Sequence, residues 1–435
     1  MATPKSLPGM DDILPGEIEK WQAIEEKAKE VFCLYGYSEI RTPILEEISL
    51  FRQSVGDDTD IVQKQMFSLQ ADSEKEICLR PEQTASIVRA YIEHSIAKKE
   101  EMTKYYYSGP MFRRERPQRG RKRQFYQIGA EAIGSNSSYL DAEIIFLISD
   151  ILKAVKVGNY QIELSSIGCR GCQPKYKAAL KQYFQSKIKL LCQDCQRRFK
   201  TNILRILDCK KEGCQMVIQK APSVLDYLCE KCNKHFEGVQ DGLNLAGIPC
   251  HLSEVSLRTD SSQCVINPRI VRGLDYYTNT VFEFTHPDLG SQNALAAGGR
   301  YNNLIGEMGG ENQPAIGFSL GIERVSAVSG LVPEEDSPFI FFAPLGQAAY
   351  REAYRIMQGL RRKGVASEID YQDKSLKAQM RAADKLGAKW VAILGEKELK
   401  KKVIILRNME TKEQEEINLR DVIQKVTSRQ VTSKK

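Results

Sequence analysis

The sequence lacks any long hydrophobic run, and its first residues are polar. No stretch reaches the roughly 18 uncharged apolar residues of a membrane-crossing helix, so we expect no membrane span. The opening segment, MATPKSLPGMDDILPG, has no apolar core of the kind found in secretory signals. Without such a signal, 12 cysteines, several of them in CxxC pairs, indicate a protein of the reducing cytoplasm.

The sequence also lacks a Ser or Cys in the setting of a catalytic nucleophile, so covalent catalysis is not indicated. Its composition is that of an ordinary globular protein, with 435 residues of which 42% are hydrophobic and 27% charged. The net charge is +7, and residues 331–435 hold 21 Lys and Arg against 15 Asp and Glu. This basic C-terminal quarter fits a partner with a phosphate backbone, and chance clustering is the alternative.

The most informative stretch is GPMFRRERPQRGRKRQFYQIGAEAIG, at residues 109–134. Two segments of alternating polar and apolar residues flank a loop with Pro117 and Gly120, which predicts an antiparallel hairpin. The loop carries five cations in eight residues, namely Arg116, Arg119, Arg121, Lys122 and Arg123. Two interpretations stay open: a solvated basic hairpin tip, or a phosphate site that uses the planar guanidinium fork of Arg.

Eight of the 12 cysteines fall in one segment, residues 169–232. They form four close pairs, which are Cys169 and Cys172, Cys192 and Cys195, Cys209 and Cys214, and Cys229 and Cys232. Such pairs, repeated tens of residues apart, are typical of structural zinc sites, and eight thiols suffice for two four-Cys sites. Buried free thiols are the alternative, and the spacing leaves the pairing open. Amphipathic patterns at 175–189 and 221–236 predict a small helical insertion.

The remaining segments show helical or strand-like patterns. Helices are predicted at 17–35 and 142–157, a strand broken by Pro43 at 37–51, a strand and then a helix at 77–91, a strand at 271–284, and a strand and then a helix at 314–325. After a linker at 326–338, strands and helices alternate, which predicts a mixed or parallel sheet with flanking helices. The polar tail from residue 426 is expected to be disordered.

Three of these segments resemble, in order, the motifs of the class II aminoacyl-tRNA synthetases. Residues 17–51 resemble motif 1, which forms the dimer interface in that family. Residues 109–134 resemble motif 2, which holds ATP and whose loop reaches the tRNA acceptor end. PAIGFSLGIERV, at 314–325, resembles motif 3.

Two further peptides resemble the histidyl-tRNA synthetases in particular. VRGLDYYTNTVFEF, at 271–284, is similar to the signature peptide of that family, and a different class II synthetase would not share it. RPEQT, at 80–84, is similar to the family's RPEGT, with Gln83 in place of Gly. The opening PGMDDILP also departs from the family pattern, because Pro8 stands where an Arg usually precedes the Gly.

The resemblance implies a role for each matching residue. It makes Arg113 and Arg272 the catalytic cations beside the reacting α-phosphate. The histidine site would comprise Glu82, Gln83 (through its backbone), Thr84, Arg113, Gln127, Glu131, Arg272, Tyr276, Tyr277 and Tyr301. The ATP site would comprise Arg113, Glu115, Arg121, Phe125, Gly321 and Arg324, and the tRNA acceptor end would meet Arg116, Arg119, Lys122 and Arg123. Without the resemblance, Glu82 would be interpreted as a helix-capping carboxylate, and Tyr276 and Tyr277 as residues of the hydrophobic core.

Together the patterns and the resemblance predict an α+β catalytic domain with a mixed, mainly antiparallel sheet (the class II synthetase fold), a small helical Cys-rich insertion and a C-terminal α/β domain. This last domain resembles the anticodon-binding domain shared by several class II synthetases. The expected boundaries are 1–168 and 251–330 for the catalytic domain, 169–250 for the insertion, 338–425 for the anticodon-binding domain and 426–435 for the tail. The implied activity is the ligation of L-histidine to tRNA(His) through a histidyl-adenylate. The substrate complex would be ATP with Mg²⁺, the insertion would hold structural Zn²⁺, and the protein would be a cytoplasmic homodimer.

Two other functions compete with this one. A non-catalytic, histidine-binding regulator of histidine biosynthesis would use the same catalytic fold, but such paralogues generally lack the C-terminal domain and the ATP-binding arginines. This chain keeps Arg113, Arg324 and a basic C-terminal domain. A zinc-dependent nucleic-acid module would explain the Cys pairs and nothing of the other patterned segments.

Overall fold

We describe a computed structural model of the chain, for residues 3–56, 59–69, 75–118, 120–252, 264–270, 274–290, 292–333 and 337–433. The chain divides into two compact units, Met1–Pro333 and Glu334–Lys435. Among the described residues, no helix has the length and apolar character needed to cross a bilayer.

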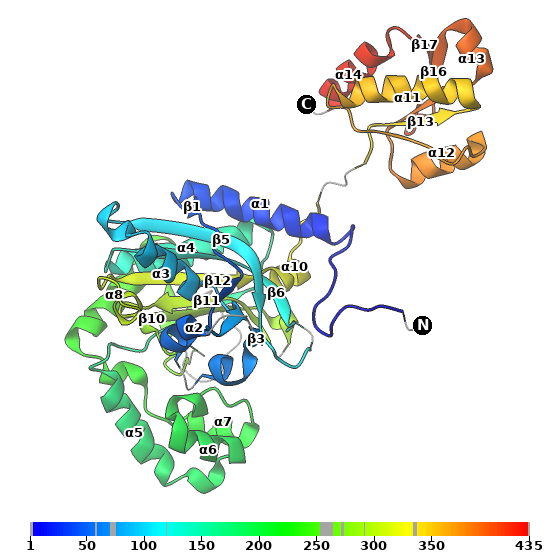
Figure 1. Cartoon of the computed structure of the whole chain (residues 1–435). Helices are drawn as coiled ribbons and strands as arrows, with labels where there is room; N and C mark the ends of the chain where they lie inside the picture. The colour runs from blue at the N-terminus through cyan, green and yellow to red at the C-terminus, as the bar shows by residue number, and fades with distance from the viewer. Residues whose placement is uncertain are drawn as a thin grey trace. The chain divides into compact units, whose positions relative to one another are not determined.

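The first unit is built on a mixed sheet (Figure 1). Its described strands lie in the order β1-β5-β6-β12-β11-β10-β7-β9-β8, and a smaller sheet has the order β2-β4-β3. The large sheet comprises β1 (Ser38–Glu39), β5 (Thr103–Phe112), β6 (Gln124–Ile133), β7 (Gln161–Ser166), β8 (Cys250–Leu252), β9 (Cys264–Ile266), β10 (Thr278–Thr285), β11 (Ala294–Arg300) and β12 (Ala315–Gly321). The small sheet comprises β2 (Leu45–Glu47), β3 (Phe67–Leu69) and β4 (Ile77–Leu79). The five central pairings, from β5–β6 to β10–β7, are antiparallel, which confirms the predicted sheet.

Helices complete this unit. They are α1 (Ile18–Leu34), α2 (Ile48–Val55), α3 (Thr84–Glu93), α4 (Ser138–Ala154), α5 (Gln173–Gln185), α6 (Gln193–Thr201), α7 (Glu212–Ile218), α8 (Glu230–Leu245), α9 (Leu304–Glu307) and α10 (Ile322–Val328). Apolar side chains of α1, α4 and α8, such as Trp21, Ile148 and Val239, share one core with the sheet. We call the sheet surface that they cover the helix face, and the opposite surface the pocket face.

The alternation of side chains along the central strands separates these two faces. On β6, Ile128, Ala130 and Ala132 belong to the core of the helix face. Successive strand residues point to opposite faces, so Gln127 and Glu131 lie on the pocket face. On β12, Ile316 and Phe318 are likewise in that core. One buried, apolar face therefore fixes which side chains of motif 2 and motif 3 reach the pocket.

The predicted hairpin is confirmed, because β5 and β6 pair antiparallel from Thr103 with Ile133 to Phe112 with Gln124. The strand predicted at 37–51 is wrong at its end, since residues from Ile48 onward form α2. A helix there buries Ile48 and Phe51 in one core with Ala85 of α3. Within the strand predicted at 271–284, β10 begins only at Thr278 in the described residues, and its pairing with β11 shifts between Thr278 and Val281.

The Cys-rich insertion has a hydrophobic core of its own. Tyr176, Leu180 and Phe184 of α5 pack against Ile206 and Val217. We call residues 173–228 the lobe; its helices α5, α6 and α7 gather apart from the sheet in Figure 1. The lobe nevertheless belongs to the first compact unit, Met1–Pro333. The predicted helix at 221–236 is wrong in its first part, because α8 begins only at Glu230 and runs on to Leu245.

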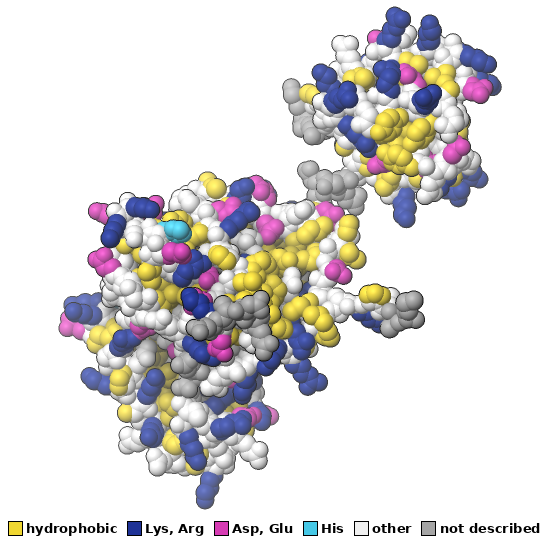
Figure 2. All heavy atoms as spheres, in the orientation of Figure 1, with side chains coloured by type: hydrophobic (Ala, Val, Ile, Leu, Met, Phe, Trp, Pro, Cys, Tyr) yellow, Lys and Arg dark blue, Asp and Glu magenta, His cyan; other side chains and the backbone are white. Residues whose placement is uncertain are grey.

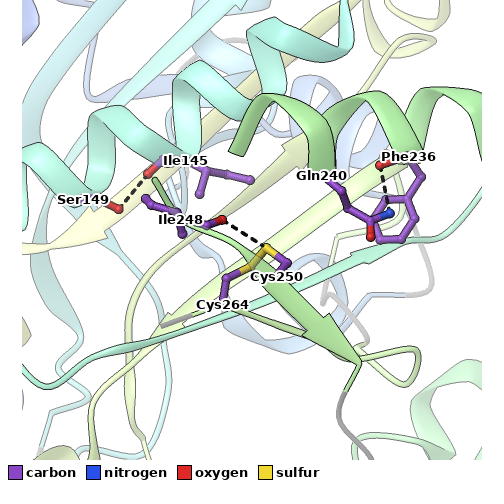
Figure 3. The surroundings of a disulfide bond; sticks show 7 residues. All are labelled: Ile145, Ser149, Phe236, Gln240, Ile248, Cys250 and Cys264. Atoms are coloured by element: carbon purple, nitrogen blue, oxygen red, sulfur yellow. Dashed lines mark hydrogen bonds between the residues drawn. A yellow bond between two sulfur atoms is a disulfide. The ribbon is translucent and has the colours of Figure 1, made fainter. Parts of the chain in front are cut away.

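A disulfide joins Cys250 of β8 to Cys264 of β9, beside Ile248 (Figure 3). The two residues are direct partners in this parallel strand pair, and their Cα atoms are 4.5 Å apart. Sequence analysis expected reduced cysteines and did not predict this pair. The spacing of the pair resembles no motif, and only the strand pairing brings the two thiols together.

The second unit is an α/β domain. Its strands are β13 (Ile340–Pro344), β14 (Ser367–Ile369), β15 (Trp390–Leu394), β16 (Val403–Asn408) and β17 (Gln414–Asn418), and its helices are α11 (Gln347–Arg361), α12 (Leu376–Lys385), α13 (Glu396–Lys401) and α14 (Val422–Ser433). The order β14-β13-β15-β16-β17 is parallel over the first three strands and antiparallel thereafter, which confirms a mixed sheet.

The tail predicted to be disordered from residue 426 instead continues α14 as far as Ser433. Val422 and Val426 are buried in the core of this unit together with Ile404 and Ile417. Spaced four residues apart, the two valines lie on one face of the helix, and their burial stabilises a segment whose composition is otherwise polar.

Candidate active site

A cavity of about 320 Å³ lies on the pocket face. Most of the residues that sequence analysis assigned to the histidine and ATP sites line it. These are Glu82, Gln83, Thr84, Arg113, Glu115, Arg121, Phe125, Gln127, Tyr276, Tyr277, Tyr301, Gly321 and Arg324. Thr84 lies in α3, Phe125 and Gln127 in β6, Gly321 in β12 and Arg324 in α10. The others lie in the segments just outside α3, β5, β6, β10 and β11. The sheet thus gathers residues that are up to 242 positions apart into one pocket.

Glu131 lies beneath this lining and is only 1% exposed. Its carboxylate accepts hydrogen bonds from the hydroxyls of Tyr301 and Thr84, the latter at 2.7 Å. No cation is among the groups that shift its pKa, and burial raises that pKa to about 8 against the opposing effect of the two hydroxyls. Gly317 faces it on β12, where a Cβ would collide with the carboxylate. The sequence therefore makes room for a buried, nearly uncompensated acid.

Glu82 stands at the entry to α3. Its two carboxylate oxygens accept from the backbone N–H groups of Thr84, at 2.8 Å, and Ala85, at 2.9 Å. Burial raises the pKa of Glu82, and these two N–H groups oppose that shift. The capping interpretation is therefore correct, and the capping carboxylate also lines the cavity. Gln83 directs its side-chain amide to the Thr42 hydroxyl, at 2.7 Å.

Three tyrosines form an aromatic wall around the same end of the cavity. The Tyr276 ring lies 4.7 Å from the Tyr277 ring and 5.7 Å from the Tyr301 ring, centroid to centroid. All three are buried, and the ring centroids fall within the range of favourable aromatic pairs. This end of the cavity thus combines apolar ring faces with the Glu131 carboxylate, which suits a flat, polar ring.

The other end of the cavity is cationic. The Arg113 guanidinium carbon lies 5.1 Å from the centroid of the Phe125 ring, and Nε of Arg113 donates to the Pro81 carbonyl. Arg121 pairs with the buried Glu115. Arg324 donates to the carbonyls of Gly120 and Ala294. Burial lowers the pKa of Arg324, and neighbouring Arg113 and Arg121 lower it further. Guanidinium groups remain charged nonetheless, so this end attracts anions.

The described cations of the hairpin loop differ in their surroundings: some contact the cavity or its lining residues, and Arg116 does not. Lys122 pairs with Asp11 at 3.3 Å and lines the cavity, and Nε of Arg123 donates to the Glu115 carbonyl. Arg116 is exposed and does not line the cavity. The positions of Arg119 and Arg272 lie outside the described residues.

Five polar side chains that line the cavity lie outside the site predicted from the sequence: Tyr107, Glu283, Gln292, Ser319 and Glu323. Ser319 accepts a hydrogen bond from the Gln127 amide, and Glu323 accepts from the backbone N–H of Tyr126. Ser319 follows Gly317 at the strand period of two, so alternation along β12 could have identified it. No sequence signal marks Gln292.

The N-terminal segment supports the hairpin loop. The Gly9 carbonyl accepts from the backbone N–H groups of Arg123, at 2.8 Å, and Gln124, at 3.1 Å. Pro8, which replaces the Arg expected in the opening peptide, stands directly before this contact. The backbone of the segment, rather than a side chain at position 8, therefore makes the connection to the loop.

The eight cysteines of the insertion converge in two groups of four. The neck cluster holds Cys169, Cys172, Cys229 and Cys232, and the tip cluster holds Cys192, Cys195, Cys209 and Cys214. Within each cluster the sulfur atoms all lie within 4.8 Å of one another. The sequence left open which Cys pairs share a site. In the structure the first Cys pair joins the fourth, and the second joins the third.

The sheet, the β5–β6 hairpin and the β12–α10 unit beneath one pocket define a class II aminoacyl-tRNA synthetase. Residues 9–325 match the histidyl-tRNA synthetase family, and residues 340–429 match the anticodon binding domain family. The histidine–tRNA ligase of Desulforamulus reducens is 45% identical over 419 residues, covering 95% of this chain and 97% of that protein. The ligase of Halothermothrix orenii is 46% identical over 426 residues, covering 97% and 98%.

A solved structure agrees with these matches. The crystal structure of apo S. aureus histidyl-tRNA synthetase has a TM-score of 0.79 at 33% identity, covering 98% of this chain and all of that one. The chain belongs to the histidyl-tRNA synthetase family.

We expect the substitution Glu131→Gln to stabilise the protein at high pH. The ordinary pKa of 4.5 is raised to about 8, so the native state keeps a proton that the unfolded state has lost between these two values. The contribution of protonated Glu131 to the free energy of unfolding is fully present below about pH 4.5, and it is lost as pH rises through about 8. The free energies of unfolding of the two proteins, measured by denaturant titration, should diverge over this window by roughly 5 kcal/mol at most. Parallel curves of unfolding free energy against pH would contradict the raised pKa.

Proposed function

We propose that the cavity on the pocket face activates histidine with ATP and transfers it to tRNA(His). Histidine–tRNA ligation is the activity of the family to which the chain belongs. The observation that carries the proposal is the buried Glu131 carboxylate, held by Tyr301 and Thr84 next to the tyrosine wall. A site of this kind selects a ring that offers an N–H group.

In this proposal the histidine side chain enters the aromatic end. Its ring nitrogens contact the Glu131 carboxylate, which accepts the ring N–H, and the Tyr277 hydroxyl, and Glu82 and Thr84 hold the ammonium group. A substrate without a ring N–H would leave the buried carboxylate unpaired, which is the strongest form of rejection available to a binding site. Gln127 holds the amino and carboxylate end, and Tyr276 and Tyr301 enclose the ring.

ATP, as its Mg²⁺ complex, occupies the cationic end. A histidine carboxylate oxygen attacks the α-phosphorus, the bond from that phosphorus to the bridging oxygen breaks, and pyrophosphate leaves. Arg113 and Arg272 stabilise charge on the α-phosphate, Arg324 holds the departing pyrophosphate, and the adenine stacks on Phe125 above Gly321. Glu115 and Arg121 complete this end. The enzyme contributes positioning and charge stabilisation, so no protein nucleophile is required.

In the second step a ribose hydroxyl of the terminal adenosine of tRNA attacks the acyl carbon of histidyl-adenylate, and AMP leaves. Arg116, Arg119, Lys122 and Arg123 of the hairpin loop contact the acceptor end. The C-terminal unit, whose visible face carries many Lys and Arg side chains in Figure 2, binds the anticodon region.

Two properties of the whole protein follow the same reasoning. We propose a homodimer formed through α1 and the segment that follows it, as in the motif 1 interface of the family. We also propose a cytoplasmic location, where tRNA and ATP are available. Neither property enters the chemistry of the pocket.

The regulator function is the less favoured alternative. A structure described as an ATP phosphoribosyltransferase regulatory subunit/histidyl-tRNA synthetase from Bacillus halodurans shares the fold, with 21% identity and a TM-score of 0.62. The cationic end of the cavity favours the ligase, because a protein that only binds histidine needs neither Arg113 nor Arg324 beside Phe125. The match of residues 340–429 to an anticodon binding domain favours it as well.

Amino-acid-dependent ATP–pyrophosphate exchange tests the function directly. Among the twenty amino acids, only histidine should support exchange. Glu131→Gln should lower kcat/KM for histidine roughly 100-fold, the effect of about 3 kcal/mol for a charge-assisted hydrogen bond.

The control is Glu143→Gln on α4, a partly exposed carboxylate that pairs with Lys104 away from the cavity. It should leave exchange unchanged. Near-normal exchange in Glu131→Gln would remove the proposed imidazole contact, and histidine binding without any exchange in the wild-type protein would support the regulator.

The contact between the hairpin loop and tRNA has its own signature. The double substitution Arg116→Gln and Arg119→Gln should weaken tRNA binding and flatten its salt dependence, by about 0.7 in the log–log slope for each lost phosphate contact. Binding is measured by fluorescence anisotropy at several salt concentrations, with Lys29→Gln on α1 as the control. An unchanged slope in the double variant would show that the loop does not contact the acceptor end.

We further propose that each cysteine cluster binds a structural zinc ion. Tetrahedral Zn–S bonds of about 2.3 Å place ligand sulfurs about 3.8 Å apart. The Sγ atoms of Cys169 and Cys172 are 3.6 Å apart, those of Cys172 and Cys232 are 3.9 Å apart, and those of Cys192 and Cys209 are 3.9 Å apart. Backbone N–H groups of Cys229 and Cys192 also point at sulfur atoms of their own clusters.

The purified protein should therefore contain two zinc ions per chain, measured by plasma mass spectrometry. Cys195→Ser should leave one. A metal content of zero in protein purified without chelators, together with ten titratable thiols after denaturation, would favour the alternative of buried free thiols.

A further inference from the structure

We infer that the neck cluster is a positioning centre for the histidine pocket, whereas the tip cluster serves only the fold of the lobe. This inference rests on the proposed function and on the proposed zinc ions. It assigns different roles to two metal sites that are alike in sequence. The argument depends on what lies beside each cluster.

The neck cluster closes the base of the lobe. Cys169 and Cys172 stand where the chain leaves β7, and Cys229 and Cys232 stand where it returns at the start of α8. One metal ion at this place would join the entry and the exit of the lobe to each other. It would also fix the start of α8, whose side chains Phe236 and Val239 pack on the helix face of the sheet.

The neck cluster also contacts β10 directly. Sγ of Cys232 lies 3.3 Å from Oδ1 of Asn279. A metal-bound thiolate accepts rather than donates, so with zinc in place the Asn279 amide presents its N–H group to this sulfur. The backbone of Asn279 is held from the same side, since it donates to the Gly168 carbonyl at 3.0 Å and accepts from Ile167 at 2.8 Å.

Asn279 occupies the irregular point of β10. Its φ is +50°, a left-handed conformation that Asn tolerates better than most residues, and the pairing of β10 with β11 shifts here. Two residues earlier stands Tyr277 of the aromatic wall. The neighbouring Thr278 accepts, through its hydroxyl, the backbone N–H of Asn302, which follows Tyr301. A displacement of Asn279 would therefore move both tyrosines.

A second connection reinforces the first. His235, one turn after Cys232 on α8, contacts the fully buried Asp141 at 2.8 Å. Asp141 also accepts from the hydroxyl of Thr280, next to Asn279, and from the Arg300 guanidinium, next to Tyr301. The start of α8 is thus attached to both strands that carry the aromatic wall.

The tip cluster has different surroundings. Cys195, Cys209 and Cys214 are buried in the core of the lobe with residues such as Leu191 and Ile206. Among the described residues, the hydrogen bonds of the tip sulfurs stay within the cluster, from the Cys192 N–H to Cys214 and between Cys192 and Cys209. Loss of the tip metal should loosen the lobe and leave β10 in place.

The test compares Cys232→Ser with Cys195→Ser in ATP–pyrophosphate exchange. The neck variant should raise the KM for histidine about tenfold or more while the KM for ATP stays within about twofold, because the aromatic end moves and the cationic end does not. The tip variant should change the KM for histidine less than the neck variant does. Equal effects of the two variants on the KM for histidine would overturn the inference.

Because a cysteine variant can fail to fold, Asn279→Gly provides a decisive second measurement. Glycine accepts a φ of +50° and removes only the side chain that faces Cys232. This variant should keep two zinc ions per chain and still raise the KM for histidine about threefold to tenfold. Asn233→Ala, an exposed residue beside Cys232 on α8, is the control and should leave both quantities unchanged.

The outcomes separate the proposals. Wild-type protein without histidine-dependent exchange would contradict the proposed function, and wild-type protein without zinc would contradict the metal sites. Wild-type protein with both, together with an unchanged KM for histidine in Asn279→Gly, would overturn only the positioning role of the neck cluster.

Discussion

The pocket depends on one buried carboxylate that has no cation beside it among the described residues. Within that part of the chain Glu131 has two hydroxyl donors and no ion pair, and the sheet around it accommodates that arrangement: Gly317 leaves it space, and Thr84 and Tyr301 arrive from α3 and from the end of β11. Burying an acid in this way is costly unless the group takes up a proton or finds a donor. The free pocket is therefore prepared for a ligand that supplies the missing N–H group.

The opposite face of the sheet also buries an acid, but there the acid has a cationic partner. Asp141 is as deeply buried as Glu131, yet it pairs with Arg300, which is itself fully buried and also donates to the carbonyls of Ser135 and Ser137. Asp141 therefore has a buried cationic partner, whereas Glu131 has only hydroxyl donors among the described residues. Arg300 and Tyr301 are consecutive at the end of β11. The pairing of Asp141 with Arg300 therefore also holds Tyr301, whose hydroxyl donates to Glu131.

Much of this could be predicted from the sequence, because the relevant signals are local. Alternation at 109–134 gives the hairpin and its two faces. The peptides at 80–84 and 314–325, and the described part of the peptide at 271–284, each contribute residues to one cavity. What escaped prediction depends on contacts distant in sequence. The pairing of eight cysteines, the Cys250–Cys264 disulfide and the interruption in β10 are set by strand neighbours. The tail from 426 was mispredicted because two valines outweigh its polar composition.

The neck cluster brings the two ends of a long excursion of the chain together. Cys172 and Cys232 are 60 residues apart in sequence, and their sulfur atoms are 3.9 Å apart. A segment whose ends meet can be lengthened, shortened or exchanged without moving the strand before it or the helix after it. The lobe is thus modular in evolutionary terms: its sequence can drift quickly, or be acquired from elsewhere, while the synthetase sheet beneath it stays the same.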